Sequence, residues 1–210
     1  VLTLGRAAKR ENVLLGEKEL AARGVELYET DRGGDVTYHG PGQLVGYPVF
    51  DLKPDRKDVR KYVSGLEEAV IRTLAEYGIE AGRVRKWTGV WVGAEDDPRA
   101  VKVCAIGVHI RKWITTHGFA LNVRPDLTHF GMIVPCGIQE RGVSSMSQLL
   151  GRPVDLEEVA GRVAAKMGAV FEAEVVEQGF DLETVSVAVL REAPEGPQVL
   201  VLDRIPERGG

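Results

Sequence analysis

The sequence predicts an α/β (α+β) protein in which amphipathic helices pack on a sheet. Apolar residues recur at helical spacing over Val59–Tyr77 and again from about Leu156 to Gly168. The runs Val101–Ile110 and Ile114–Val123 follow each other closely, which predicts an antiparallel meander. With 44% apolar residues, the chain can form a sizeable core. We expect one domain over residues 1–210, with the part from about residue 151 as a candidate small subdomain.

The N-terminal part of the chain is predicted to deliver a glycine-rich stretch. Val1–Gly5 is typical of a strand end, Glu11–Arg23 has loose helical spacing before Gly24, and Val25–Thr30 has strand character. Arg32–Gln43 then holds four glycines in twelve residues, and Leu44–Leu52 resumes strand character, so a strand-loop-strand unit is expected. Ordered glycine costs backbone entropy, so this density indicates unusual dihedrals or a backbone that a ligand approaches closely.

The first long helix is expected between the caps Asp58 and Gly78, and it leads into the meander through Gly89–Gly93 and a turn at Glu95–Arg99. Strand alternation predicts that Lys102 faces the same way as Cys104, Ile106 and Val108, with Val101, Val103, Ala105 and Gly107 on the other face. A lysine on an apolar face is costly unless it is paired or lies at a cleft. Lys102 is therefore a candidate functional residue, and the alternative is that it snorkels at a strand end.

The segment Asp126–Gly142 has no periodic pattern, and it holds Cys136 between a proline and a glycine. These flanks put the thiol on a turn, where reactive groups tend to be presented. A short helix is expected after Ser144, then the helix beginning near Asp155, a strand over Phe171–Val176, and an edge hairpin from Val185.

Composition excludes several classes of function. The formal charge of -4 argues against a general nucleic-acid binder, and the sequence has no apolar run of about 20 residues, so we expect a cytoplasmic protein without a membrane partner. The two cysteines form no CxxC pair and the four histidines lack zinc-site spacing, so we expect no metal. There is no phosphate-binding loop of the GxxxxGK[ST] type. A loop thiol together with a strand lysine points instead to nucleophilic acyl chemistry, because a nearby ammonium favours the thiolate.

Four motifs occur in order along the chain: RGGDVTYHGPGQLVGYP from Arg32, KVCAIGVHI from Lys102, HGFALNV from His117, and the run Pro135-Cys-Gly137. Together they resemble the motifs of the octanoyltransferase family of lipoate biosynthesis. The resemblance implies a two-layer fold, a mixed sheet with packed helices, akin to biotin and lipoate protein ligases. It also implies transfer of an octanoyl (or lipoyl) group from acyl carrier protein to a lysine of lipoyl domains, without ATP or another cofactor.

The resemblance further assigns residues and partners. Cys136 matches the acyl-thioester nucleophile and Lys102 the lysine that tunes its pKa, with His117 or His39 as candidate assistants. The acyl-binding segments match Arg32, Gly33, Gly34, Asp35, Val36, Thr37, Tyr38, His39, Ala105, Ile106, Gly107, Gly118, Phe119 and Ala120. The implied acceptors are lipoyl domains of 2-oxoacid dehydrogenase complexes and the glycine cleavage H protein, and the enzyme is expected to be a monomer. Family members carry a strand and helix ahead of a segment like VLTLGR, so part of the sheet or pocket wall is expected to be missing here.

Three other functions compete with this one. They are an ATP-dependent lipoate or biotin protein ligase, a cysteine-dependent acyl hydrolase using Cys136 with His117 or His39, and a non-catalytic acyl-binding module. Leu44, Ile106, Phe119 or Leu121 are expected to line an acyl tunnel, and backbone N–H groups near Gly137 or the glycine-rich stretch to stabilise the oxyanion. The basic run Lys53–Lys61, with Arg83, Arg85 and Lys86, is either a solvated surface or a dock for the acidic carrier.

Overall fold

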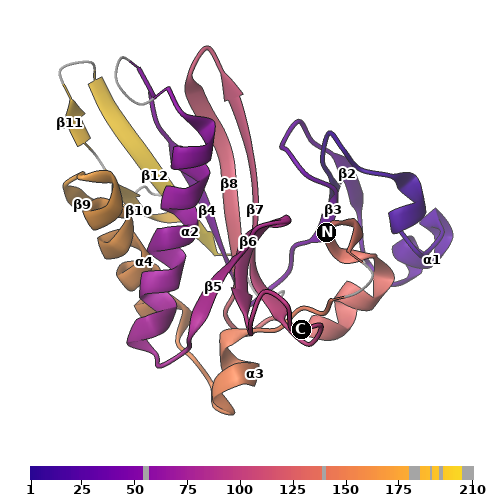
Figure 1. The fold of residues 1–210 in the computed structure, drawn as a ribbon. Coiled ribbons are helices and arrows are strands. Elements are labelled where there is room, and N and C mark those ends of the chain that lie inside the picture. Colours follow the sequence, from indigo (N-terminus) through magenta and orange to yellow (C-terminus); the bar gives the residue numbers. More distant parts are fainter. Residues whose placement is uncertain (54–56, 139–140, 180–184, 190, 194–195, 205–210) are drawn as a thin grey trace.

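The computed structural model describes residues 1–53, 57–138, 141–179, 185–189, 191–193 and 196–204 of the chain, with side chains up to residue 175 apart from Cys136. Helices and two sheets form layers, and the predicted α/β class is confirmed (Figure 1). The large sheet has nine strands within this part of the chain, in the order β5-β6-β7-β8-β4-β12-β10-β9, with β11 paired to β12. Its strands are β4 (Gln43–Val49), β5 (Ala81–Val84), β6 (Trp87–Val92), β7 (Val101–Arg111), β8 (Ile114–Asn122), β9 (Val175–Gly179), β10 (Val185–Val189), β11 (Arg191–Ala193) and β12 (Gly196–Arg204).

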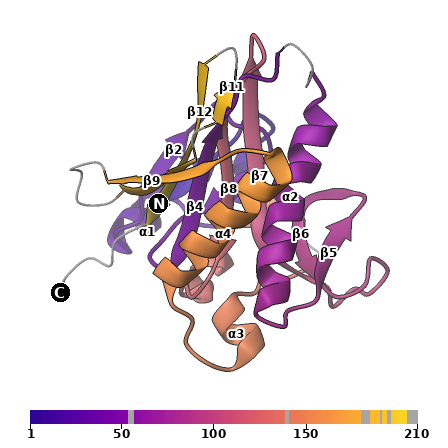
Figure 2. The same cartoon turned by 90° about the vertical axis from the view of Figure 1, so that its left-hand side faces the viewer.

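One face of the large sheet is covered by two helices, α2 (Val59–Glu76) and α4 (Leu156–Phe171) (Figure 2). Both begin where their caps predict, because the Asp58 carboxylate accepts from the Lys61 N–H at 3.0 Å and that of Asp155 from the Glu158 N–H at 2.8 Å. The main core lies between these helices and the sheet, and it includes Leu44 and Leu121. Neither leucine therefore lines a tunnel on the opposite face. None of the helices in the described ranges is long and apolar enough to cross a membrane.

The other side of the large sheet carries a small three-stranded sheet in the order β2-β1-β3, with a core of its own (Figure 1). Its strands are β1 (Leu2–Leu4), β2 (Leu27–Glu29) and β3 (Val36–Tyr38), accompanied by α1 (Glu17–Ala22). The pairing of β1 with β2 is parallel and that of β1 with β3 is antiparallel, whereas the large-sheet pairings are antiparallel. Mixed pairing is thus a property of the small sheet.

Several predicted elements differ from the observed ones. The helix expected over Glu11–Arg23 is a 3₁₀ turn at Arg10–Asn12 followed by α1, because the bridge between Val13 and Ile133 interrupts it. The expected strand-loop-strand unit is wrong, since β2 and β4 belong to different sheets and β3 lies inside the glycine-rich stretch.

The C-terminal part of the chain also departs from expectation. The predicted edge hairpin lies partly inside the sheet, because β12 pairs with β4. The short helix α3 (Met146–Leu150) is capped by Ser145, not by the predicted Ser144.

Candidate active site

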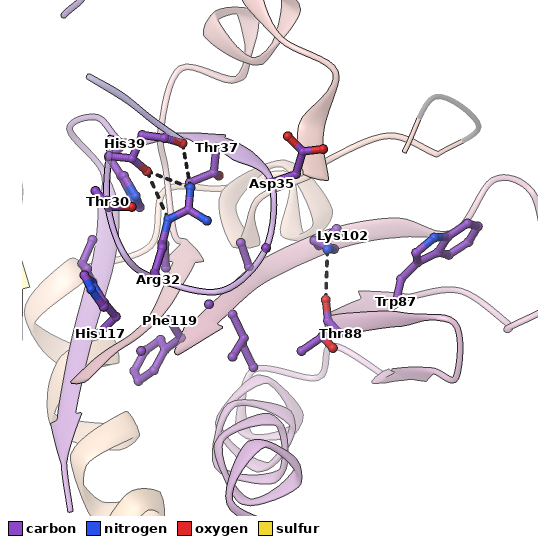
Figure 3. A pocket seen from close by; sticks show the side chains of 18 of the residues that line it. Thr30, Arg32, Asp35, Thr37, His39, Trp87, Thr88, Lys102, His117 and Phe119 are labelled. Carbon is purple, nitrogen blue, oxygen red and sulfur yellow. Dashed lines mark hydrogen bonds between the residues drawn. The ribbon is translucent and has the colours of Figure 1, made fainter. Parts of the chain in front are cut away.

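A cavity of about 620 Å³ opens between the small sheet and the exposed face of the large sheet. Its floor is largely apolar and is formed by β4, β7 and β8, which contribute Val45, Ala105, Ile106, Gly118, Phe119 and Ala120. The opposite wall comes from the N-terminal segment and the glycine-rich stretch, which contribute Thr3, Arg32, Gly34, Asp35, Thr37 and His39 (Figure 3). Of the other sequence-predicted site residues, Lys102, Gly107 and His117 also line the cavity, whereas Val36 and Tyr38 belong to the core of the small sheet.

Lys102 reaches the cavity through a β-bulge in β7. Trp91 of β6 faces Lys102, but the preceding residue Val90 faces Cys104, so Val103 is an extra residue on β7. Val103 and Cys104 are consecutive and both lie in the main core, which strict alternation would forbid. The predicted facing of Lys102 and Val103 is therefore wrong, while Ala105 and Gly107 face as expected.

The Lys102 side chain is only 6% exposed, and its ammonium is held by specific contacts. Nζ donates to the Thr88 carbonyl oxygen at 3.0 Å and lies 4.8 Å from the centre of the Trp91 ring (Figure 3). A buried ammonium is costly without partners, so these groups fix where the charge sits.

The turn that carries Cys136 is a single 3₁₀ turn, Pro135–Gly137, and it is anchored on both sides. Before it, the Val134 N–H donates to the Asn12 carbonyl at 2.8 Å. After it, Lys102 pairs with the following segment, because its N–H donates to the Gly142 carbonyl at 3.0 Å and its carbonyl accepts from Ser144 at 3.0 Å. The Cys136 side chain lies outside the described residues. Its neighbours are informative, since Pro135 shares a small recess with Lys102, and Ile138 lines the main cavity.

Asp35 links the glycine-rich stretch to this turn. Its carboxylate accepts from the Asn12 amide at 2.5 Å and from the Val36 N–H at 2.7 Å. A Cβ on Gly137, whose φ is +67°, would lie 2.7 Å from Asp35 Oδ2. Within the turn the Gly137 N–H donates to the Val134 carbonyl at 3.0 Å. The Gly137 N–H is thus already engaged within the turn, while an oxyanion donor near Gly137 or in the glycine-rich stretch stays a prediction.

The glycine-rich stretch crosses over β7 where neither backbone carries a side chain. The Gly33 N–H donates to the Val108 carbonyl at 2.9 Å, and a Cβ on Gly107 would lie 2.7 Å from the Gly33 oxygen. These glycines allow two backbones to approach each other, a role that differs from the predicted close approach of a ligand. Arg32 beside them donates from Nη2 to the Thr3 carbonyl at 2.7 Å, which directs its guanidinium along the cavity wall.

His39 is held as a neutral imidazole with a defined tautomer. The Gln43 amide nitrogen donates to the Tyr38 carbonyl at 3.1 Å and to Asn122 Oδ1 at 2.9 Å, so its oxygen faces His39 Nδ1 at 3.3 Å. Nδ1 must then carry the proton, which leaves Nε2 as an acceptor. Burial, with a smaller contribution from the Arg32 charge, lowers the pKa of His39 to about 4.

His117 sits at the far end of the cavity from Lys102. It faces Val108 across the β7–β8 ladder, six residues beyond Lys102, which corresponds to about 20 Å of strand (Figure 3). Its Nε2 lies 2.5 Å from Asp31 Oδ1, and His109 Nδ1 lies 2.7 Å from Asp31 Oδ2. The hydrogen bonds from His117 and then His109 lower the pKa of the Asp31 carboxyl. The two candidate assistants both line the cavity and differ in their partners, because His117 Nε2 is bound to Asp31 whereas His39 uses Nδ1 toward Gln43.

The second cysteine and the basic run lie away from the cavity. Cys104 is fully buried in the main core, and burial raises the pKa of its thiol strongly, so it is an inert packing group. Leu52, next to the basic run Lys53–Lys61, donates its N–H to the Trp113 carbonyl at the β7–β8 turn, eleven residues from Lys102. Arg56 itself lies outside the described residues. Arg83 is paired with Glu67 and Glu68, and of the predicted basic residues only Lys86 lines the cavity among those described.

A model of the lipoyl protein ligase A/B catalytic domain matches residues 1–168. The chain belongs to this family. Curated relatives named octanoyltransferase confirm the resemblance seen in the motifs. The octanoyltransferase of Myxococcus xanthus is 54% identical over 210 residues, covering 100% of this chain and 59% of the relative. That of Flavobacterium johnsoniae is 51% identical, covering 84% of this chain and 76% of the relative. The chain thus spans less than two thirds of the Myxococcus relative.

Solved structures place this octanoyltransferase-family chain in the ligase fold. A bi-partite lipoate protein ligase from Thermoplasma acidophilum has a TM-score of 0.63 at 17% identity, covering 81% of this chain and 67% of that chain. A lipoate-protein ligase A bound with ATP has a TM-score of 0.60 at 17% identity, with coverages of 81% and 68%. Biotin protein ligase from Aquifex aeolicus has a TM-score of 0.50 at 14% identity, with coverages of 97% and 95%. The predicted biotin/lipoate protein ligase-like fold is confirmed.

Sequence reasoning missed some residues of the candidate site. Gln43 is 1% exposed and Asn122 is 4% exposed, and together they fix the His39 tautomer. Both lie within the quoted motifs, and a buried amide on an apolar strand was the available signal. Trp87, which lines the cavity next to Lys102, had no such signal because its position depends on the pairing of β6 with β7.

Proposed function

We propose that this protein transfers an octanoyl (or lipoyl) group from an acyl carrier protein to a lysine of lipoyl domains, through a thioester on Cys136 and without ATP. The observation that carries the proposal is the position of Lys102. Its ammonium is buried at one end of an apolar cavity, and residues on both sides of Cys136 line the same cavity or the recess beside it. Relatives named octanoyltransferase support the identity of the acyl group.

In the first step the Cys136 thiolate attacks the carbonyl of the donor thioester. A sulfur–carbon bond forms, the donor's thiolate leaves and takes up the proton of the Lys102 ammonium, and the acyl group stays on Cys136 beside a neutral Lys102 amine. One thioester replaces another, so the step is close to balanced and needs no activation by ATP. The Lys102 ammonium favours the thiolate form of Cys136, because a nearby positive charge stabilises the anion.

In the second step the lysine amine of the acceptor attacks the acyl-enzyme. A carbon–nitrogen bond forms, the Cys136 sulfur leaves as thiolate, and the amide product makes the step downhill. The amine has an ordinary pKa of about 10.4 and must lose a proton, so a base is required. We assign this role to Lys102, with the free Nε2 of His39 as the assisting acceptor.

The proposed function also indicates which proteins accept the acyl group. One fold relative is described together with its E2 lipoyl domain, which supports lipoyl domains as the acceptor class. We therefore propose lipoyl domains of 2-oxoacid dehydrogenase complexes and the glycine cleavage H protein as acceptors, with a cytoplasmic monomer as the working form. Residues 1–210 would form a single catalytic domain, since α4 and β12 complete the helical layer and the large sheet.

The test is intact mass spectrometry after mixing with octanoyl-acyl carrier protein in the absence of ATP. We expect an octanoyl adduct in wild type and in Cys104→Ala, and none in Cys136→Ser. An adduct that survives Cys136→Ser but is lost in Cys104→Ala would refute the nucleophile assignment.

The same assay separates the competing functions. Transfer that occurs only with free octanoate and ATP would identify a ligase, a reading kept open because one fold relative is described as bound with ATP. Release of free octanoate without an amine acceptor would identify a hydrolase. A Cys136→Ala variant with unchanged ligand affinity and unchanged biological function would identify a binding module.

A further inference from the structure

The Lys102 end of the cavity lies beside a cluster of cations and indole rings that the proposed chemistry does not use. Lys86 and Trp87 line this end, and Figure 3 shows Trp87 beyond Lys102. The Lys86 ammonium lies 5.0 Å from the centre of the Trp87 ring, and the Arg141 guanidinium carbon lies 4.9 Å from it. Two positive charges therefore lie against one aromatic side chain, and of the two Lys86 lines the cavity while Arg141 contacts Trp87 of its wall.

Arg141 holds a buried donor that lacks an acceptor. Its Nη2 donates to the Glu95 carbonyl at 2.6 Å, which fixes the guanidinium plane. Its Nη1 is buried and has no hydrogen-bond partner among the described residues. An unsatisfied N–H on a charged group is costly, and a guanidinium presents paired donors suited to phosphate or carboxylate oxygens. The Arg141 guanidinium therefore retains one unused donor next to the Trp87 wall of the cavity.

Local acidic groups are engaged with other partners. The Asp97 carboxylate is paired with Arg99, whose hydrogen bonds lower its pKa, and the Arg141 charge makes only the smallest contribution. The Glu95 carboxylate accepts from the Arg85 N–H at 3.0 Å. No ion pair of Lys86 or Arg141 with a carboxylate is found within the described ranges. The mouth therefore keeps an excess of positive charge.

We propose that Lys86 and Arg141 bind the phosphate group of the acyl donor's thioester arm, with Trp87 as the surface that the arm crosses. The inference rests on the proposed function, because it assumes a donor whose acyl thioester enters at the Lys102 end. It replaces the basic run Lys53–Lys61 as the dock for the donor, since that run lies by the distant β7–β8 turn. The phosphate oxygens would complete the hydrogen bonding of Arg141 Nη1 and neutralise the charge at the mouth.

The experiment compares two donors that differ by the phosphate alone, octanoyl-pantetheine and octanoyl-4′-phosphopantetheine. The readout is the ratio of their KM values for acyl-enzyme formation, followed by intact mass. In wild type we expect the phosphorylated donor to have the lower KM by about tenfold or more, the range for hydrogen bonds to charged groups. In Arg141→Gln the ratio should fall toward one, and Lys86→Gln should reduce it less.

The matched control is Arg99→Gln, which removes an arginine that is 89% exposed and paired within its own loop. Its ratio should equal that of wild type. Lys86 is exposed, so Lys86→Gln keeps the test valid if Arg141→Gln does not fold. A wild-type ratio near one, or a ratio that Arg141→Gln and Lys86→Gln leave unchanged, overturns the phosphate site. Failure of the proposed function looks different, because neither donor would then acylate the wild-type protein.

Discussion

Replacing His39 by glutamine should make the protein less sensitive to acid. The folded protein holds the pKa of His39 at about 4, below the ordinary value of about 6.5, because the imidazole is buried beside Arg32. The unfolded chain therefore binds the proton more readily than the folded chain. Stability from the neutral imidazole is complete above about pH 6.5 and is lost as the pH falls toward 4.

The size of the effect follows from the two pKa values. Between pH 7 and pH 4.5 this single group removes about 2.5 kcal/mol from the free energy of unfolding. Urea denaturation at both pH values, on wild type and His39→Gln, gives the loss for each protein. The carboxyl groups contribute equally to both losses, so their difference isolates His39. Equal losses in the two proteins would show that His39 titrates normally and would refute the buried neutral imidazole.

Three further predictions concern packing and charge. Gly118→Ala should lower the free energy of unfolding by about 3 kcal/mol in urea denaturation, because the new methyl would overlap the Gly46 carbonyl and the Pro48 ring. The control is Gly131→Ala, whose methyl meets open space and should change the free energy of unfolding little. Glu67→Gln should cost about 1–2 kcal/mol in the same assay, since Glu67 is buried and accepts from the Gly89 N–H and Arg83, while Glu80→Gln, at an exposed glutamate, serves as the control. Lys102→Arg should still form the acyl-enzyme but transfer the acyl group about a hundredfold more slowly in single-turnover assays, because arginine does not deprotonate. Equal transfer rates in Lys102→Arg and wild type would show that Lys102 is not the base.

The parts of the fold that sequence predicts well are those specified locally. Both long helices begin at a carboxylate cap that accepts from the N–H three residues on, and Gly78 ends α2 at a φ of +76°. The short strands of the small sheet were harder to predict, because β1 and β3 hold only three residues each and their pairing partners are distant in sequence.

Features of the site that depend on local sequence could also be predicted, whereas those that depend on distant residues could not. Motifs singled out Lys102 and the cavity wall at Arg32, since residue types and spacing carry that signal. The tautomer of His39 depends on Gln43 and on Asn122, 79 residues further along the chain, so no local pattern contains it. The charge at the mouth depends on the stacking of Arg141 on Trp87, which only the folded chain brings together.

The bulge at Val103 also determines which kinds of sequence change the site can survive. The direction in which Lys102 points is set by a count of residues between β6 and β7, in addition to its own identity. If Val103 were accommodated in simple alternation, without the bulge, Lys102 would face the same way as Cys104, into the apolar core, although the amino acid itself would remain. Substitutions at Val103 that keep its volume should be tolerated, whereas one added residue in β6 opposite Val103, which would remove the bulge, should abolish activity. Among homologous chains, the spacing between these two strands is therefore expected to vary less than the side chains that fill it.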